Sequence, residues 1–209
     1  MGTLSREQLG GWSMIAGAVM SLVTMAFHPT GGDQPLLSLA VHALATCGVP
    51  IAVYGAWVLT RHLAVGGPLS ELALAFYAMA GAAALAAATA SGFLAADLIA
   101  QMEAATGDIQ AAARAVLHYN TDVNQAYARI LVAATAASIG IWSVEILRTG
   151  LLRRSAGVLG CLFAVVALTA LLSGRLTLDV HGFGAVVLGQ GMWLVLVGWE
   201  LRGVRTGAA

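Results

Sequence analysis

Six long apolar runs divide this chain of 209 residues, and each is close to the roughly 20 residues that a helix needs to cross a bilayer core. They cover residues 9–27, 39–59, 72–96, 126–147, 156–172 and 182–201. Charged residues make up only 10% of the chain, whereas a soluble domain carries about 25%. The alternating pattern of a membrane β-barrel is absent. We therefore predict an all-α polytopic membrane helix bundle of about six transmembrane helices, forming a single integral membrane domain over residues 1–209.

The arginines predict the orientation of these helices, because basic residues are retained on the cytoplasmic side of a membrane. With a cytoplasmic N-terminus, three of the ten arginines lie outside, at Arg114, Arg129 and Arg175. The other seven lie in cytoplasmic segments, at Arg6, Arg61, Arg148, Arg153, Arg154, Arg202 and Arg205. We expect both termini in the cytoplasm of a bacterium and a multi-pass protein of its inner membrane, surrounded by membrane lipid.

Two segments suggest how the bundle is arranged. Residues 78–92 are almost all small, which permits close packing of helices on every side and predicts that this helix is central. Residues 97–125 form the only long connection, on the predicted outer side. Apolar residues recur there at helical spacing, so we expect a short interfacial helix that is either a lid or a filler.

Four of the five histidines fall on the predicted outer side. His28 closes the run 9–27, whereas His42, His118 and His181 each lie where a run begins on that side. Every helix that runs from outside to inside therefore begins with a histidine. Helical spacing and the outer loops add further polar residues to this layer, namely Ser38, Thr46, Asp97, Gln101, Asp122, Gln125, Arg129, Asp179 and, from the first loop, Asp33.

These histidines have the chemistry of metal ligands. Neutral imidazole is the commonest zinc ligand, and three protein ligands with one vacant position define a catalytic zinc site. We expect His42, His118 and His181 to converge as ligands of zinc or another transition metal, with His28 as a further candidate. Two of the same histidines would alternatively serve as axial ligands of haem. A metal-free polar cavity, or histidines that only finish helix ends, are the remaining interpretations.

Charged neighbours supply candidate catalytic groups. Asp122, one turn from His118, or Asp97 would orient a ligand or act as a general base. Arg129 lies about one turn inside the predicted membrane boundary, where an unpaired charge is costly, so we expect it to bind an anionic group.

One short pattern resembles a known family. SLAVH, from Ser38 to His42, together with Asp97 is similar to the Ser-x3-His and Asp elements of alkaline-ceramidase-like membrane hydrolases, which are zinc enzymes of seven helices. The chain has six predicted spans and lacks the His-x3-His near its end, where only His181 is present. The resemblance covers a handful of positions and favours a hydrolase by analogy alone.

Together these features favour a metal-dependent, hydrolase-like membrane enzyme that acts on a lipid or a small amphiphilic molecule. Open alternatives are a haem-binding or redox module, a non-catalytic ligand-binding or transport protein, and an assembly subunit. Balanced charge without a basic stripe excludes nucleic acid as a partner. Walker loops, dinucleotide-binding glycine patterns and GxSxG elbows are absent. The sequence leaves open whether the chain is an enzyme, which substrate it takes and whether it forms a homo-oligomer.

Overall fold

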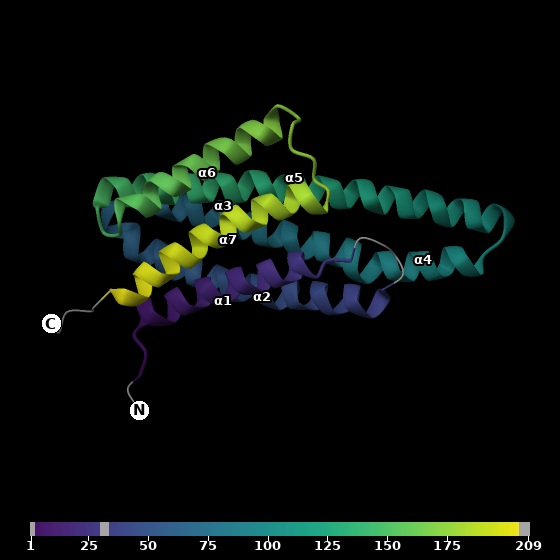
Figure 1. The fold of residues 1–209 in the computed structure, drawn as a ribbon, viewed down its shortest axis with the longest axis horizontal. Helices are drawn as coiled ribbons and strands as arrows, with labels where there is room; N and C mark the ends of the chain where they lie inside the picture. Colours follow the sequence, from purple (N-terminus) through teal and green to yellow (C-terminus); the bar gives the residue numbers. More distant parts are fainter. Residues whose placement is uncertain (1–2, 30–33, 205–209) are drawn as a thin grey trace.

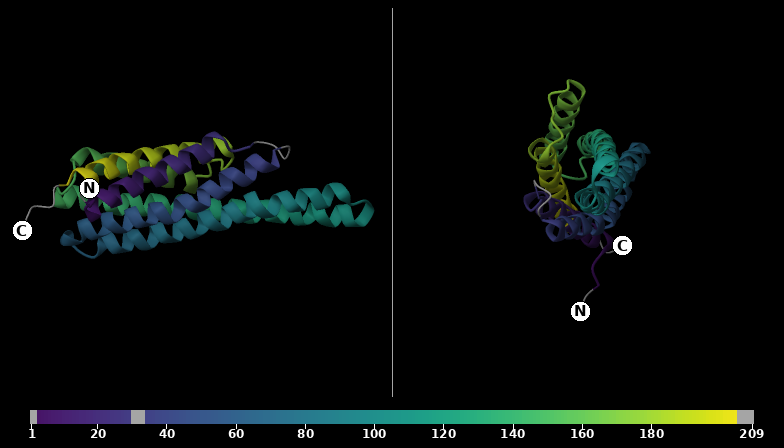
Figure 2. Two further views of the ribbon diagram at one scale, coloured as in Figure 1. Left: turned by 90° about the horizontal axis from the view of Figure 1, so that it is seen from below. Right: turned by 90° about the vertical axis from the view of Figure 1, so that its right-hand side faces the viewer.

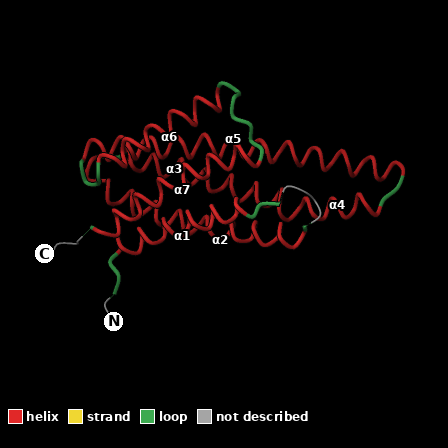
Figure 3. The backbone as a smooth tube through the Cα atoms, in the orientation of Figure 1, coloured by secondary structure: helices red, strands yellow, loops and turns green. Residues whose placement is uncertain are grey.

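The computed structural model describes residues 3–29 and 34–204, and no strand occurs among them (Figures 1 and 3). The predicted polar residue Asp33 lies outside the described residues. A short 3-10 turn, η1 (Ala64–Gly66), follows the second helix, and a π-helical segment, η2 (Thr89–Leu94), follows the third. The α-helices are α1 (Arg6–Ala26), α2 (Pro35–Leu63), α3 (Leu69–Ala88), α4 (Ala95–Ala104), α5 (Gly107–Thr149), α6 (Arg154–Leu172) and α7 (Val180–Gly203).

Six helical segments in the described ranges are long and apolar enough to cross a membrane. In one of them α3, η2 and α4 follow one another without a break, from Leu69 to Ala104. This confirms the predicted all-α polytopic bundle. The first residues of α1 and the last residues of α7 lie at the same end of the bundle, which we call the proximal end (Figure 1). The opposite end, towards α4, is the distal end.

The sequence marks several helix ends with known capping residues. Ser5 and Gln8 form a capping box at the start of α1, with each side chain accepting from the other residue's backbone N–H. Gly150 ends α5 in the left-handed conformation, with φ of 65°. Asp179 caps α7 by accepting from the backbone N–H of Gly182 at 2.8 Å.

Glycines allow α1 to pack closely against α2 and α7. A Cβ on Gly10 of α1 would lie 2.5 Å from Cγ1 of Val58, and a Cβ on Gly55 of α2 would lie 2.7 Å from the backbone nitrogen of Met14. The most deeply buried of the membrane-length helices is α5. In its apolar stretch 56% of the residues are buried, compared with 28% in that of the segment that contains α3. The prediction of a central small-residue helix over 78–92 is therefore wrong, because one face of α3 points outwards.

The connection 97–125 is a helical hairpin instead of a short helix lying on the surface. At about 1.5 Å per residue, the 43 residues of α5 span roughly 65 Å, about twice the hydrocarbon core. The first turns of α5 pack against α4, and the pair extends beyond α1, α2 and α7 at the distal end (Figures 1 and 2). No proline occurs between Leu69 and Thr149, so every residue of this stretch keeps its backbone N–H donor.

Aromatic side chains close the proximal half of the bundle. Trp142 of α5 stacks on Trp193 of α7, with ring centroids 6.2 Å apart, and its ring centroid lies 5.4 Å from that of Tyr77 on α3. The indole nitrogens donate to Thr60 on α2 and to the carbonyl oxygen of Ala156 on α6. These contacts join five helices in one core.

Candidate functional site: a cavity in the distal half of the bundle

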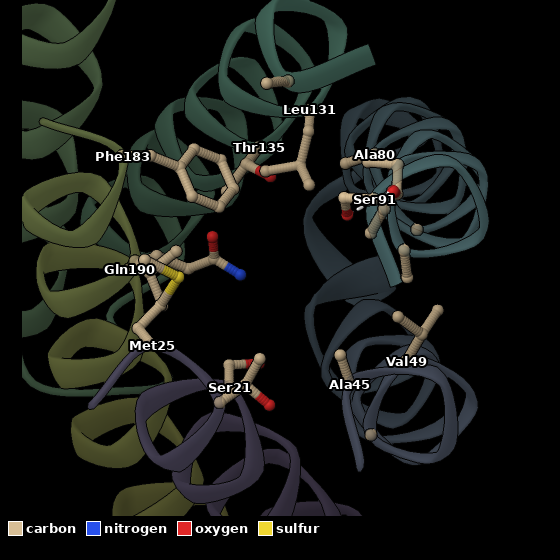
Figure 4. A pocket seen from close by; sticks show the side chains of 18 of the residues that line it. Ser21, Met25, Ala45, Val49, Ala80, Ser91, Leu131, Thr135, Phe183 and Gln190 are labelled. Carbon is tan, nitrogen blue, oxygen red and sulfur yellow. Dashed lines mark hydrogen bonds between the residues drawn. The ribbon is translucent and has the colours of Figure 1, made fainter. Parts of the chain in front are cut away.

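A cavity of about 330 Å³ lies between α1, α2, α3, α5 and α7, on the distal side of the aromatic core (Figure 4). This volume is within the range of small-molecule sites. The wall consists largely of small residues that face one another from α2, α3 and α5, among them Ala45, Gly48, Ala80, Ala84 and Ala128. The helices are held apart by tryptophan and tyrosine in the proximal half, so that alanine and glycine leave space between them here.

His42 is the buried histidine of this cavity, with only 4% of its surface exposed. Its Nδ1 lies 2.6 Å from the carbonyl oxygen of Ser38, which can only accept, so Nδ1 carries the proton of the neutral ring. The Nε2 atom is then an acceptor, and it lies 2.9 Å from the hydroxyl of Ser91. The backbone of α2 thus fixes the tautomer of His42 and directs its free nitrogen at a serine hydroxyl.

The π-helical turn η2 brings Ser91 to this position. The ring of His42 packs directly on Gly92, where a Cβ would lie 2.8 Å from Cδ2 of the ring. A π-turn disturbs the regular carbonyl pairing of a helix, and such turns occur frequently at functional sites. Asn120 of α5, itself buried, donates to the carbonyl oxygen of Ala90 at 2.9 Å and so supplies a partner for the backbone of the turn.

His28, at the end of α1, completes the distal end of the cavity. Its ring contacts that of His42 edge-to-face, with the centroids 5.0 Å apart. Its Nδ1 lies 3.1 Å from the carbonyl oxygen of Pro29. The two rings leave no space for a porphyrin between them, so His28 and His42 do not sandwich a haem in this arrangement.

The inner end of the cavity carries a polar group of a different kind. The amide of Gln190, from the middle of α7, points into the open space between the helices (Figure 4). Its Oε1 is buried and has no hydrogen-bond partner among the described residues. Tyr77 lines the cavity at the boundary with the aromatic core. A buried amide oxygen without a partner is costly, so a ligand with a donor group would be stabilised there.

The described lining contains neither lysine nor arginine, and its only carboxylate is Asp179. Asp179 lies at the distal end, outside the apolar segment of α7, and is exposed. The backbone N–H of Gly182 donates a hydrogen bond to the Asp179 carboxylate, which lowers the pKa of that carboxyl. The described part of the wall therefore has no lysine or arginine to neutralise an anionic ligand.

Of the predicted site residues, His28 and His42 line the cavity, and the other five do not. His118 and Asp122 lie in the distal half of α5; both are exposed, with Nδ1 and Oδ2 3.9 Å apart. The remaining three, His181, Asp97 and Arg129, are exposed.

No group of three or more His, Cys, Asp or Glu side chains able to hold a metal ion occurs within residues 3–29 and 34–204. The three histidines predicted to converge differ in environment, since His42 is buried in the bundle whereas His118 and His181 are exposed. Metal and haem binding stay predictions of the sequence.

Sequence reasoning missed Ser91, Gly92 and Asn120. A single serine in an alanine-rich run gives no periodic signal, and a π-turn has no recognisable sequence pattern. One available clue was the change from alanine to Thr89, Ser91 and Gly92 within a few residues.

No protein-family model, curated protein or solved structure matches this chain. The function is therefore inferred from the geometry of the cavity.

Proposed function

We propose that this protein binds a small, uncharged amphiphilic molecule within the membrane, in the cavity between α1, α2, α3, α5 and α7. One observation carries the proposal: a cavity with mostly apolar walls has the hydrogen-bonded pair His42 and Ser91 at its distal end, and at its inner end it has the amide of Gln190, whose Oε1 finds no hydrogen-bond partner among the described residues. Ligand sites combine predominantly apolar walls with a few polar groups that fix orientation.

The charge of the lining restricts the ligand class. An anionic head group would have to leave water without meeting a lysine or arginine in the described wall. A neutral head group can instead use the serine hydroxyl and the glutamine amide, while a short apolar chain lies along the alanine wall. A neutral monoester or alcohol therefore fits better than a free fatty acid.

The proposal predicts selective binding of a neutral amphiphile. Monooctanoylglycerol, added to the protein in lipid nanodiscs, should raise the unfolding midpoint saturably, because a ligand that binds only the folded state at 100 times its Kd stabilises it by about 2.7 kcal/mol. Octanoate at the same concentration should have a much smaller effect. Tryptophan emission provides a second readout, since Trp142 contacts the lining residue Tyr77.

A matched pair of variants separates cavity binding from insertion of the amphiphile into lipid. Ala84→Phe places a ring in the cavity, whereas Ala82→Phe on the same helix lies at an exposed position outside the lining. The saturable shift should be lost in Ala84→Phe and retained in Ala82→Phe. An equal shift in both variants would show that monooctanoylglycerol binds elsewhere.

A further inference from the structure

Ser91 and His42 have the geometry of a nucleophile and its general base. The Ser91 hydroxyl lies 2.9 Å from Nε2 of His42, and the opposite ring nitrogen is held by the Ser38 carbonyl oxygen at 2.6 Å. A serine hydroxyl is a weak nucleophile until an adjacent base that is itself oriented by a third group removes its proton. We propose that this pair cleaves a neutral carboxylic ester by transfer of its acyl group to Ser91, an inference that rests on the binding function proposed above.

The single proton of the Ser91 hydroxyl has two acceptors within reach. Besides Nε2 of His42, the carbonyl oxygen of Ala87 lies 2.7 Å away, one turn earlier in the chain. In the neutral tautomer, His42 can take this proton and become an imidazolium whose positive charge is stabilised by the Ser38 carbonyl oxygen. The backbone carbonyl thus fills the orienting position that a carboxylate occupies in many serine hydrolases.

The proposed reaction proceeds in two steps. The Ser91 oxygen attacks the ester carbonyl carbon while its proton passes to Nε2 of His42; the ester C–O bond then breaks, and the alcohol leaves with that proton. Water next attacks the acyl-Ser91 ester and gives its proton to His42. The carboxylic acid leaves, and the proton returns to the Ser91 oxygen.

The surroundings suit such a substrate. Both reacting groups line the cavity that the neutral amphiphile is proposed to occupy, so the ester carbonyl can lie beside Ser91 with its acyl chain along the alanine wall. The side chain of Asn124 lines the same cavity and carries N–H donors of the kind that stabilise an oxyanion. The carboxylic acid that is formed is anionic in water and meets no lysine or arginine in the described lining, which favours its departure.

An alkyl fluorophosphonate carrying an octyl chain tests the proposal, because it reacts with activated serines and leaves an adduct that peptide mass spectrometry locates. The full-length protein in nanodiscs should be labelled on Ser91. Ser91→Ala should abolish the label, and His42→Gln should slow labelling and the hydrolysis of 4-nitrophenyl octanoate by about 10²- to 10⁴-fold. Thr89→Ala is the control, since the Thr89 hydroxyl lies in the same turn, is exposed and donates to the Leu85 carbonyl oxygen of its own helix.

Binding of monooctanoylglycerol to Ser91→Ala, measured in parallel, separates this inference from the proposed function. An unlabelled wild-type protein that still binds monooctanoylglycerol would overturn the nucleophile and leave the binding function standing. A label at Ser91 that is equally fast in His42→Gln would also overturn the pair. Loss of both binding and labelling in the wild-type protein would overturn the binding function and the ester cleavage together.

Discussion

The ring of His42 lies so close to Gly92 that residue 92 has no room for a side chain. A Cβ there would overlap the Cβ and Cγ atoms of His42. We predict that Gly92→Ala displaces the ring, breaks its hydrogen bond to Ser91 and costs about 1–3 kcal/mol through overpacking. The unfolding midpoint and the rate of fluorophosphonate labelling measure the two effects.

Gly203→Ala is the matched control for this substitution, because a Cβ on Gly203 would meet no atom of the described residues within 4 Å. It should leave labelling unchanged and should not lower the unfolding midpoint. Equal behaviour of the two variants would show that His42 does not pack on the π-turn.

A second prediction separates the cavity from the predicted metal layer. His118→Ala and His181→Ala should leave the affinity for monooctanoylglycerol within about twofold, because both side chains are exposed and outside the lining. Exposed polar contacts such as that of His118 with Asp122 contribute only about 0–1 kcal/mol to stability. A loss of binding comparable to that of His42→Ala would favour the shared site expected from the sequence.

At the level of single residues, the sequence predicted part of the site. His28 and His42 stood out because histidine is rare in apolar runs and marks helix ends. Ser91 did not, because its importance depends on a ring that lies 49 positions earlier in the chain and on the helical phase of η2. Spacing within one helix carries no information about such a contact.

The π-turn η2 depends on a contact from another helix. Asn120 donates to the Ala90 carbonyl oxygen in a buried position, and a buried acceptor that loses its partner costs about 1–3 kcal/mol. We predict that Asn120→Leu lowers the stability by this amount and also slows labelling of Ser91, since the turn that holds the serine loses its partner. Thr121→Ala, an exposed neighbour whose hydroxyl bonds within α5, should change neither property.

A normal unfolding midpoint and labelling rate in Asn120→Leu would show that the turn holds its shape without α5.

Hydropathy located all six membrane segments, because apolar length is a property of the sequence alone. It placed their ends less well. Asp97 suggested the end of a span, but charge does not stop a helix, and the backbone continues to Ala104.

The whole bundle places two surface segments at opposite ends. Val65, in η1, is 86% exposed at the proximal end, and Tyr119, on the distal hairpin, is 71% exposed. The arginine distribution predicts that the distal end faces away from the cytoplasm. In a background without Cys47 and Cys161, Tyr119→Cys should react with a membrane-impermeant maleimide added outside spheroplasts, and Val65→Cys should react only after permeabilisation.

The reverse pattern would contradict the orientation predicted from the arginines. Reaction of both cysteines from outside would contradict a bundle that spans the membrane. A bundle that spans the membrane requires only that one of the two cysteines, and not both, reacts from outside.

The cavity is a property of the whole molecule, because five helices contribute to it and no segment of the sequence contains it. Photocrosslinking with a diazirine-bearing octanoyl glycerol ester, followed by peptide mapping, tests it most directly. We predict that crosslinks concentrate on the lining segments of α2, α3 and α7 and disappear in Ala84→Phe but not in Ala82→Phe. Crosslinks confined to outward-facing positions such as Leu162 and Val165 of α6, unchanged by Ala84→Phe, would contradict a ligand within the bundle.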